Sequence, residues 1–202
     1  MVNLKANKNF TLKIIEERSN FFNDLFELQK EKIIDSAFLI ANAIEETHKN
    51  KGKVIIFGNG GSNAQSSHLA AELIIRFKGD SKRNPIAAIS ISADPSVITA
   101  AGNDFNFNDI FARQLNPLVN ENDCVIAFST SGKSPNIRNG IREASKNLSS
   151  KKVFLITGYE FIEEENLNFQ IIKTPIKGAT ETYQEYHLIL IHIICNILEN
   201  IV

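Results

Sequence analysis

The chain has 202 residues, of which 43% are hydrophobic and 22% charged, which is typical of one soluble globular domain. Its formal net charge of -1 argues against a general nucleic-acid binder, because affinity for a phosphate backbone needs a basic excess. No secretory signal or membrane-spanning apolar run is visible, and Cys124 and Cys195 lie in separate apolar runs. We therefore expect buried reduced thiols in a cytoplasmic protein that binds neither nucleic acid nor a membrane.

The first part of the chain is predicted to be helical. Residues 9–50 contain no proline or glycine and repeat apolar side chains at helical spacing, up to Lys51-Gly52. The pattern predicts one long helix or two joined helices, so that residues 1–50 form an N-terminal helical arm before a domain of residues 51–202. The broad apolar stripe is equally compatible with packing on a partner subunit and with covering the sheet of the same chain.

From Lys53 onward, short apolar runs alternate with helical stretches. Strands are expected at 53–57, 86–91, 123–128, 152–156 and 168–173. Helices are expected at 63–77, 95–102 with 107–118, 134–148, a short piece near 160–165, and 180–201. This alternation predicts an α/β fold, a single domain with a parallel sheet that is covered by helices on both faces. In such sheets the ligand crevice lies at the carboxyl ends of the strands.

Two loops at predicted strand ends have the composition of phosphate-binding loops. The segment Gly58-Asn59-Gly60-Gly61-Ser62 follows an apolar strand and opens a helix, where free backbone N–H groups bind an anion well. The segment Ser129-Thr130-Ser131-Gly132-Lys133-Ser134 offers four hydroxyls in six residues. Each alone is also explained as an ordinary turn with a helix cap, but two at successive crevice-facing strand ends favour a binding role.

The first loop does not fit the nucleotide-binding motifs. No Gly-Lys-Ser/Thr follows it at Walker spacing, and Asn63 occupies the last glycine position of the dinucleotide pattern. A small phosphorylated metabolite is therefore the favoured ligand.

Three titratable side chains stand in apolar helical surroundings. His68 and Glu72 are one turn apart and can share one metal ion or one substrate. His192 lies between the apolar runs 188–191 and 193–195. Each has an ordinary alternative, a surface position for the first two and a core histidine bonded to a backbone carbonyl for His192. Burial of such groups is unfavourable, which indicates a specific reason for their presence.

Taken in order, these motifs resemble the sugar isomerase (SIS) domain family and, within it, the phosphoheptose isomerases. Those enzymes convert sedoheptulose 7-phosphate to D-glycero-D-manno-heptose 7-phosphate. The resemblance runs from about residue 20 to the end of the chain. It rests on the two loops and on His68-Leu69-Ala70-Ala71-Glu72-Leu73, Arg76-Phe77-Lys78, Asn103-Asp104, Phe111-Ala112-Arg113-Gln114, Gln184-Glu185, His187 and His192.

The resemblance implies a set of site residues and an assembly. The implied substrate-binding residues are Asn59, Gly60, Gly61, Ser62, His68, Glu72, Asn103, Asp104, Ser129, Thr130, Ser131, Ser134 and Gln184. One zinc ion per subunit is implied, bound by His68, Glu72, Gln184 and His192. Glu72 and His192 match the acid/base pair. The family's five-stranded parallel sheet and homotetramer, with sites built from more than one subunit, are implied as well.

Two alternatives stay open. Gln184 and His192 are eight residues apart, about 12 Å of helix rise, so either Gln184 lies at a frayed helix start or one ligand comes from a neighbouring chain. His187 is the alternative ligand on spacing alone. The other functional reading is a non-catalytic SIS protein that binds the bacterial replication initiator. That relative lacks the terminal-helix histidine, so the presence of both Glu72 and His192 favours an enzyme of heptose biosynthesis, for lipopolysaccharide core or capsule.

Overall fold

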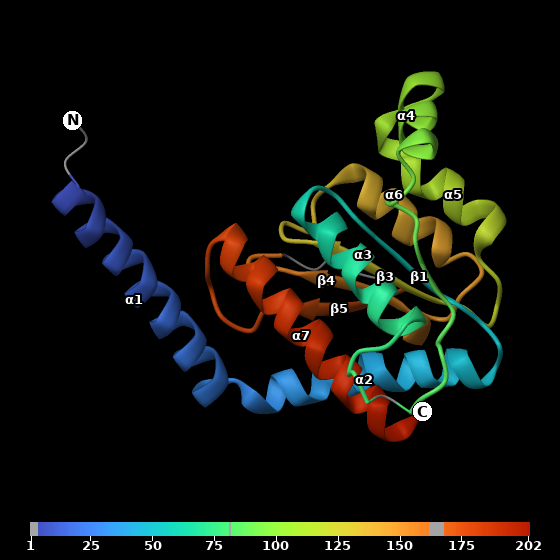
Figure 1. The fold of residues 1–202 in the computed structure, drawn as a ribbon. Coiled ribbons are helices and arrows are strands. Elements are labelled where there is room, and N and C mark those ends of the chain that lie inside the picture. Colours follow the sequence, from blue (N-terminus) through green and yellow to red (C-terminus); the bar gives the residue numbers. More distant parts are fainter. Residues whose placement is uncertain (1–3, 81, 162–167) are drawn as a thin grey trace.

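A five-stranded parallel sheet forms the centre of the molecule (Figure 1). The computed structural model describes residues 4–80, 82–161 and 168–202. The strands follow the order β2-β1-β3-β4-β5 and have the bounds β1 Val54–Gly58, β2 Ala88–Ser90, β3 Cys124–Ser129, β4 Val153–Thr157 and β5 Gln170–Lys173. The predicted α/β domain with a parallel sheet is confirmed, and each strand begins and ends within two residues of its predicted bounds.

The strands divide the interior into two cores. Every residue of β1, β3 and β4 is buried, and successive side chains point to opposite faces. Along β1, Ile56 joins one core, whereas Ile55 and Phe57 join the other. The predicted helices on both faces are confirmed (Figure 1).

Different helices pack on the two faces, and the end of the N-terminal helix adds Leu25 to the first core. The first face carries α2 (Lys30–Lys49), α3 (Gly61–Ile74) and α7 (Thr180–Ile201). The second carries α5 (Ile110–Leu118), α6 (Pro135–Ala144) and part of α4 (Pro95–Asp104). Helices α3 and α7, which hold the predicted acid/base and zinc-binding residues, therefore lie on the same face.

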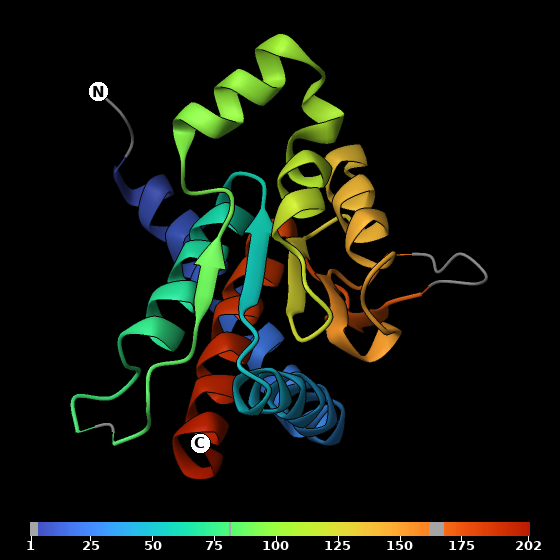
Figure 2. The same ribbon diagram turned by 90° about the vertical axis from the view of Figure 1, so that its right-hand side faces the viewer.

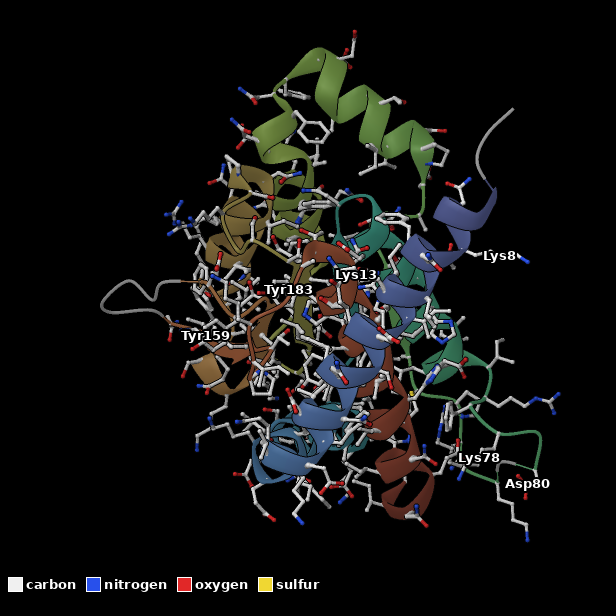
Figure 3. All side chains as sticks on the ribbon, turned by 90° about the vertical axis from the view of Figure 1, so that its left-hand side faces the viewer. Lys8, Lys13, Lys78, Asp80, Tyr159 and Tyr183 are labelled. Atoms are coloured by element: carbon white, nitrogen blue, oxygen red, sulfur yellow. The ribbon has the colours of Figure 1, made fainter. Side chains whose placement is uncertain are left out.

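The N-terminal segment consists of two joined helices that differ in their packing. Helix α2 buries its apolar stripe in the first core and so covers the sheet of its own chain. Helix α1 (Leu4–Leu28) projects from the body, and Lys8 near its free end points away from the rest of the chain (Figures 1 and 3). Arg18 joins α1 to the first turns of α7 by an ion pair of 3.3 Å with Glu185. Phe10 and Ile15 of α1 are 66% and 58% exposed.

The remaining elements are short and differ in detail from prediction. Helix α3 starts inside the glycine turn, two residues earlier than predicted, because Gly60 takes a φ of 54° that leads the chain directly into the helix. Two 3₁₀ segments, η1 (Phe107–Asp109) and η2 (Ser150–Lys152), precede α5 and β4. The helical piece predicted near 160–165 falls largely outside the described residues. No helix within the described ranges has the length and apolar character needed to cross a membrane.

Candidate active site

Both predicted phosphate loops leave the sheet at the same edge. Strands β1 and β3 are parallel neighbours, and Gly58 is paired with Phe128. The turn Asn59–Ser62 and the loop Ser129–Ser134 therefore follow adjacent strand ends, as Figure 2 shows for the carboxyl edge of the sheet. This is the position where doubly wound sheets bind their ligands.

The two loops are joined by a pair of amides. The side chain of Asn59 donates to Oδ1 of Asn136, and the side chain of Asn136 donates back to Oδ1 of Asn59, both at 2.9 Å. Asn136 is 2% exposed and lies in the first turn of α6. Sequence reasoning missed it, because its partner lies 77 residues away and the local sequence does not identify that partner. The pair fixes the spacing of the two loops.

A cleft of about 500 Å³ opens beside the second loop and the N-terminus of α7. Thr130, Ser131 and Lys133 form its wall on the β3 side. The opposite wall contains Glu160, Phe161, Gly178, Ala179, Thr180, Glu181 and Tyr183. The hydroxyls, the lysine and the helix N-terminus of this cleft suit a phosphate group. Two carboxylates also line it, and each is paired with a cation, Glu160 with Lys177 and Glu181 with Arg18. The sequence places Lys133 in the predicted loop but assigns it no binding role.

The backbone of the second loop is held in a tight turn. Gly132 has a φ of 64°, and its N–H donates to Oγ of Ser129 at 3.1 Å. The carbonyl of Thr130 accepts the N–H of Gly158, which follows β4, at 3.0 Å. Ser129 is buried, whereas Ser131 is exposed to the cleft side. The loop therefore has a fixed shape, in which the Ser129 hydroxyl is buried and the Ser131 hydroxyl is available to a ligand.

His68, Glu72 and His192 meet between α3 and α7. The two Nε2 atoms of His68 and His192 are 3.0 Å apart, and Nε2 of His68 is 3.4 Å from Oε1 of Glu72. At that distance a hydrogen bond between the rings has one Nε2 as the donor and the other as the acceptor. The side chains of His68 and Glu72 are 38% and 19% exposed, and the ring of Phe77 packs on His192. The cluster is therefore covered by Phe77 on one side and only partly buried.

Gln184 lies apart from this cluster. It is the fifth residue of α7, so it does not sit at a frayed helix start. Its carbonyl accepts a hydrogen bond from Nε2 of Gln65, and its side chain packs against Gly61 in the glycine turn. The separation from His192 remains about 12 Å along the helix. Within one chain, the structure places Gln184 with the phosphate loop and His192 with His68.

His187 is a core histidine bonded to a backbone carbonyl, which the sequence offers as the alternative interpretation of His192. Its ring is fully buried, and its Nε2 lies 3.3 Å from the carbonyl oxygen of Thr157 and 3.5 Å from Oγ1 of Thr174. Burial lowers the pKa of this imidazole to about 4. A neutral ring donating to a backbone carbonyl is a core contact, so His187 does not join the cluster on the other side of α7.

Asn103 and Asp104 lie at the end of α4, which stands away from the sheet above its carboxyl edge (Figure 2). Both are exposed, and Nδ2 of Asn103 donates to Oδ1 of its neighbour Asp104 at 2.8 Å. Within the described ranges, no hydrogen bond joins either side chain to the two loops. A single chain thus does not bring this pair to the other predicted site residues.

Two further expectations concern thiols and metals. Cys124 and Cys195 are free and buried, as predicted, and burial raises the pKa of the Cys195 thiol to about 12. In the part of the chain that the structure describes, no group of three or more His, Cys, Asp or Glu side chains is placed to hold a metal ion. His68 lies close to both His192 and Glu72, at 3.0 and 3.4 Å, but one chain does not arrange these three as a metal site.

Comparisons with known proteins agree with this architecture. A family model of the SIS domain matches residues 15–149, more than half of the chain. A phosphoheptose isomerase from Aquifex aeolicus is 35% identical over 94% of this chain and 95% of its own length. One from Burkholderia pseudomallei is 37% identical over 86% and 85% of the two chains. The structure of a phosphoheptose isomerase from Francisella tularensis superposes with a TM-score of 0.79 at 27% identity, covering 99% of this chain and 100% of that one.

The chain therefore belongs to the SIS domain family and, within it, to the phosphoheptose isomerases, which are enzymes. The terminal helix that carries Gln184 and His192 lies beyond the region matched by the family model. The relatives named above nevertheless align over most of this chain.

Proposed function

We propose that the protein converts sedoheptulose 7-phosphate to D-glycero-D-manno-heptose 7-phosphate, in heptose biosynthesis for lipopolysaccharide core or capsule. One observation carries the proposal. His68 and Glu72, on the helix that begins at the predicted phosphate loop, meet His192 of the terminal helix. The phosphoheptose isomerase relatives support it. The two free, buried thiols support our placing this activity in the cytoplasm.

The chemistry requires one base and one acid. Ketose–aldose isomerisation moves a proton between adjacent carbons through an enediol, so a base takes a proton from carbon and an acid serves the neighbouring oxygen. Glu72 acts as the base that removes the carbon-bound proton. His192 delivers a proton to the oxygen from its ring nitrogen. His68 contacts both side chains, at 3.0 and 3.4 Å, and so orients them relative to each other.

We also propose a homotetramer in which neighbouring subunits complete each site. Gly61 and Glu72 are separated along α3 by about 16 Å of helix rise. An extended seven-carbon sugar phosphate, built from bonds of about 1.5 Å, reaches about 10 Å from its phosphate to its reacting carbons. A substrate whose phosphate is held in the loops of one chain therefore reaches the acid/base cluster more easily across a subunit boundary. The exposed apolar side chains of α1, such as Phe10 and Ile15, support an interface there.

Zinc, one ion per subunit, is the cofactor that we propose. Imidazole nitrogen and carboxylate oxygen are donors that this ion prefers, and His68 lies 3.0 Å from His192 and 3.4 Å from Glu72, although the described residues of one chain do not place the three as a metal site. The chain alone does not complete a four-ligand set, so the partner subunit's Gln184 would supply the fourth ligand. When bound, zinc would supply Lewis-acid stabilisation of negative charge on substrate oxygens.

One set of measurements tests the function. Purified protein is incubated with sedoheptulose 7-phosphate, and aldose formation is followed before and after treatment with a chelator and after zinc is returned. We expect turnover that falls with chelation and returns with zinc, and a tetramer by light scattering. Absence of turnover, together with tight binding to a replication initiator protein, would overturn the proposal in favour of the non-catalytic SIS function.

A further inference from the structure

Arg83 has an unusually complete set of contacts for a loop residue. It lies between α3 and β2, yet its side chain is only 1% exposed. Its Nε donates to Oε1 of Glu199 at 3.1 Å, and one terminal nitrogen donates to the carbonyl of Leu73 at 2.9 Å and to that of Asn84 at 3.0 Å. The other terminal nitrogen donates to the carbonyl of Glu72.

Two of these acceptors belong to the exposed end of a helix. The last four carbonyls of an α-helix have no partner within it, and α3 ends at Ile74. The carbonyls of Glu72 and Leu73 are in this group, and the partial negative charge of the helix end favours a cation there. The planar guanidinium bonds the two carbonyls through two different nitrogens, whose relative positions are fixed. Arg83 thus holds the backbone of Glu72 itself.

The same guanidinium ties this helix end to α7. Glu199 is 8% exposed and lies two turns beyond His192. Helices α3 and α7 run side by side in the same direction (Figure 1), with Gln65 bonded to the carbonyl of Gln184 before the histidine pair. On the other side of the histidine pair, the contact between Arg83 and Glu199 joins the end of α3 to α7. The acid/base cluster therefore lies between two cross-links.

We infer that Arg83 is a positioning residue for the isomerase reaction, which fixes the last turn of α3 against α7 so that Glu72 and His68 face His192. The inference rests on the function proposed above. Among the described residues, no hydrogen bond or ion pair joins Arg83 to the cleft or to the cluster side chains, so it acts through the backbone of Glu72 and through Glu199. The loops that hold the phosphate are at the opposite end of α3. Loss of the clamp therefore lowers kcat and leaves KM nearly unchanged.

The test uses a variant that removes both partners of the buried ion pair. Arg83→Met alone would strand the buried Glu199 carboxylate and destabilise the fold, so the main variant is Arg83→Met with Glu199→Met. Lys82→Met, at an exposed position in the same loop, is the matched control. We measure kcat, KM and backbone hydrogen exchange of peptides from the start and the end of α3.

In the double variant we expect kcat to fall about a hundredfold, as misplacement of a reacting group by about 1 Å produces, with KM within about twofold of wild type. Exchange should accelerate in residues 70–75 and stay unchanged in residues 61–66, and Lys82→Met should match wild type in both measurements. A folded double variant with wild-type kcat overturns the inference, and so does a rise in KM at constant kcat.

The exchange measurement separates this inference from the proposed function. If the wild-type protein does not turn over sedoheptulose 7-phosphate, the proposed function fails. Unchanged exchange at residues 70–75 would overturn the clamp by itself, because those amides report on the helix end without any substrate.

Discussion

Acidification from pH 7 to pH 5 should destabilise the fold through a single side chain, His187. Burial lowers the pKa of this imidazole from its usual 6.5 to about 4. Between these two values the unfolded chain binds a proton that the folded chain does not. The contribution of His187 to stability is therefore fully present above pH 6.5 and is lost as the pH falls towards 4.

The size of the effect follows from the two pKa values. At pH 5 most unfolded chains carry the proton and about a tenth of the folded chains do, which lowers the free energy of unfolding by about 2 kcal/mol relative to pH 7. Because the ring is fully buried, no solvent screening reduces this value.

Urea unfolding at pH 7, 6 and 5 tests this expectation. The reference is His187→Gln, which keeps an N–H donor for the carbonyl of Thr157 but does not titrate, so that the difference between the two proteins cancels the titration of carboxylates. Protomer concentration is held constant, because association would also shift the apparent stability. Wild type should lose about 2 kcal/mol more than the variant between pH 7 and pH 5. Parallel losses in the two proteins would refute the buried, neutral state of His187.

Three further substitutions test the site. Glu72→Gln should reduce turnover of sedoheptulose 7-phosphate by about a thousandfold while calorimetry still detects binding, because only the base is lost; full turnover would exclude Glu72 as the base. Gly132→Ala should destabilise the protein by about 1 to 3 kcal/mol and raise KM, because a side chain at a φ of 64° would also overlap an aromatic ring of the cleft wall. Gly79→Ala, where the added carbon meets nothing within 4 Å, is its control, and equal melting temperatures for the two variants would contradict the reasoning. Asn136→Ala should cost about 1 to 3 kcal/mol and weaken substrate binding, because the amide of Asn59 loses its partner; unchanged melting and KM would show that the amide pair does not hold the loops.

Local patterns were sufficient to predict most of the fold. The central strands are continuous apolar runs because both of their faces are buried, and this signal needs no knowledge of the neighbours. The loops at their ends follow from glycine and serine content. The spacing of four residues likewise placed His68 and Glu72 on one side of α3, where the structure brings them within 3.4 Å.

Contacts between distant segments could not be predicted in this way. His187 and His192 stand in equally apolar sequence, but five residues of helix turn them about 140° apart, so one faces the core and the other faces His68. Which face α7 presents to α3 depends on the packing of the whole layer. The partnerships of Asn136 with Asn59 and of Arg83 with Glu199 join segments 77 and 116 residues apart, and neither partner carries a local signal of the other.

The amide pair of Asn59 and Asn136 is electrically neutral, and this suits a joint between two loops for which we propose phosphate binding. A carboxylate in its place would repel an incoming phosphate, and a lysine would attract the product as strongly as the substrate and slow its departure. Amides neither gain nor lose protons in the physiological range. The frame that sets the distance between the two loops can thus stay intact through every catalytic cycle, whether the cleft beside the second loop is full or empty.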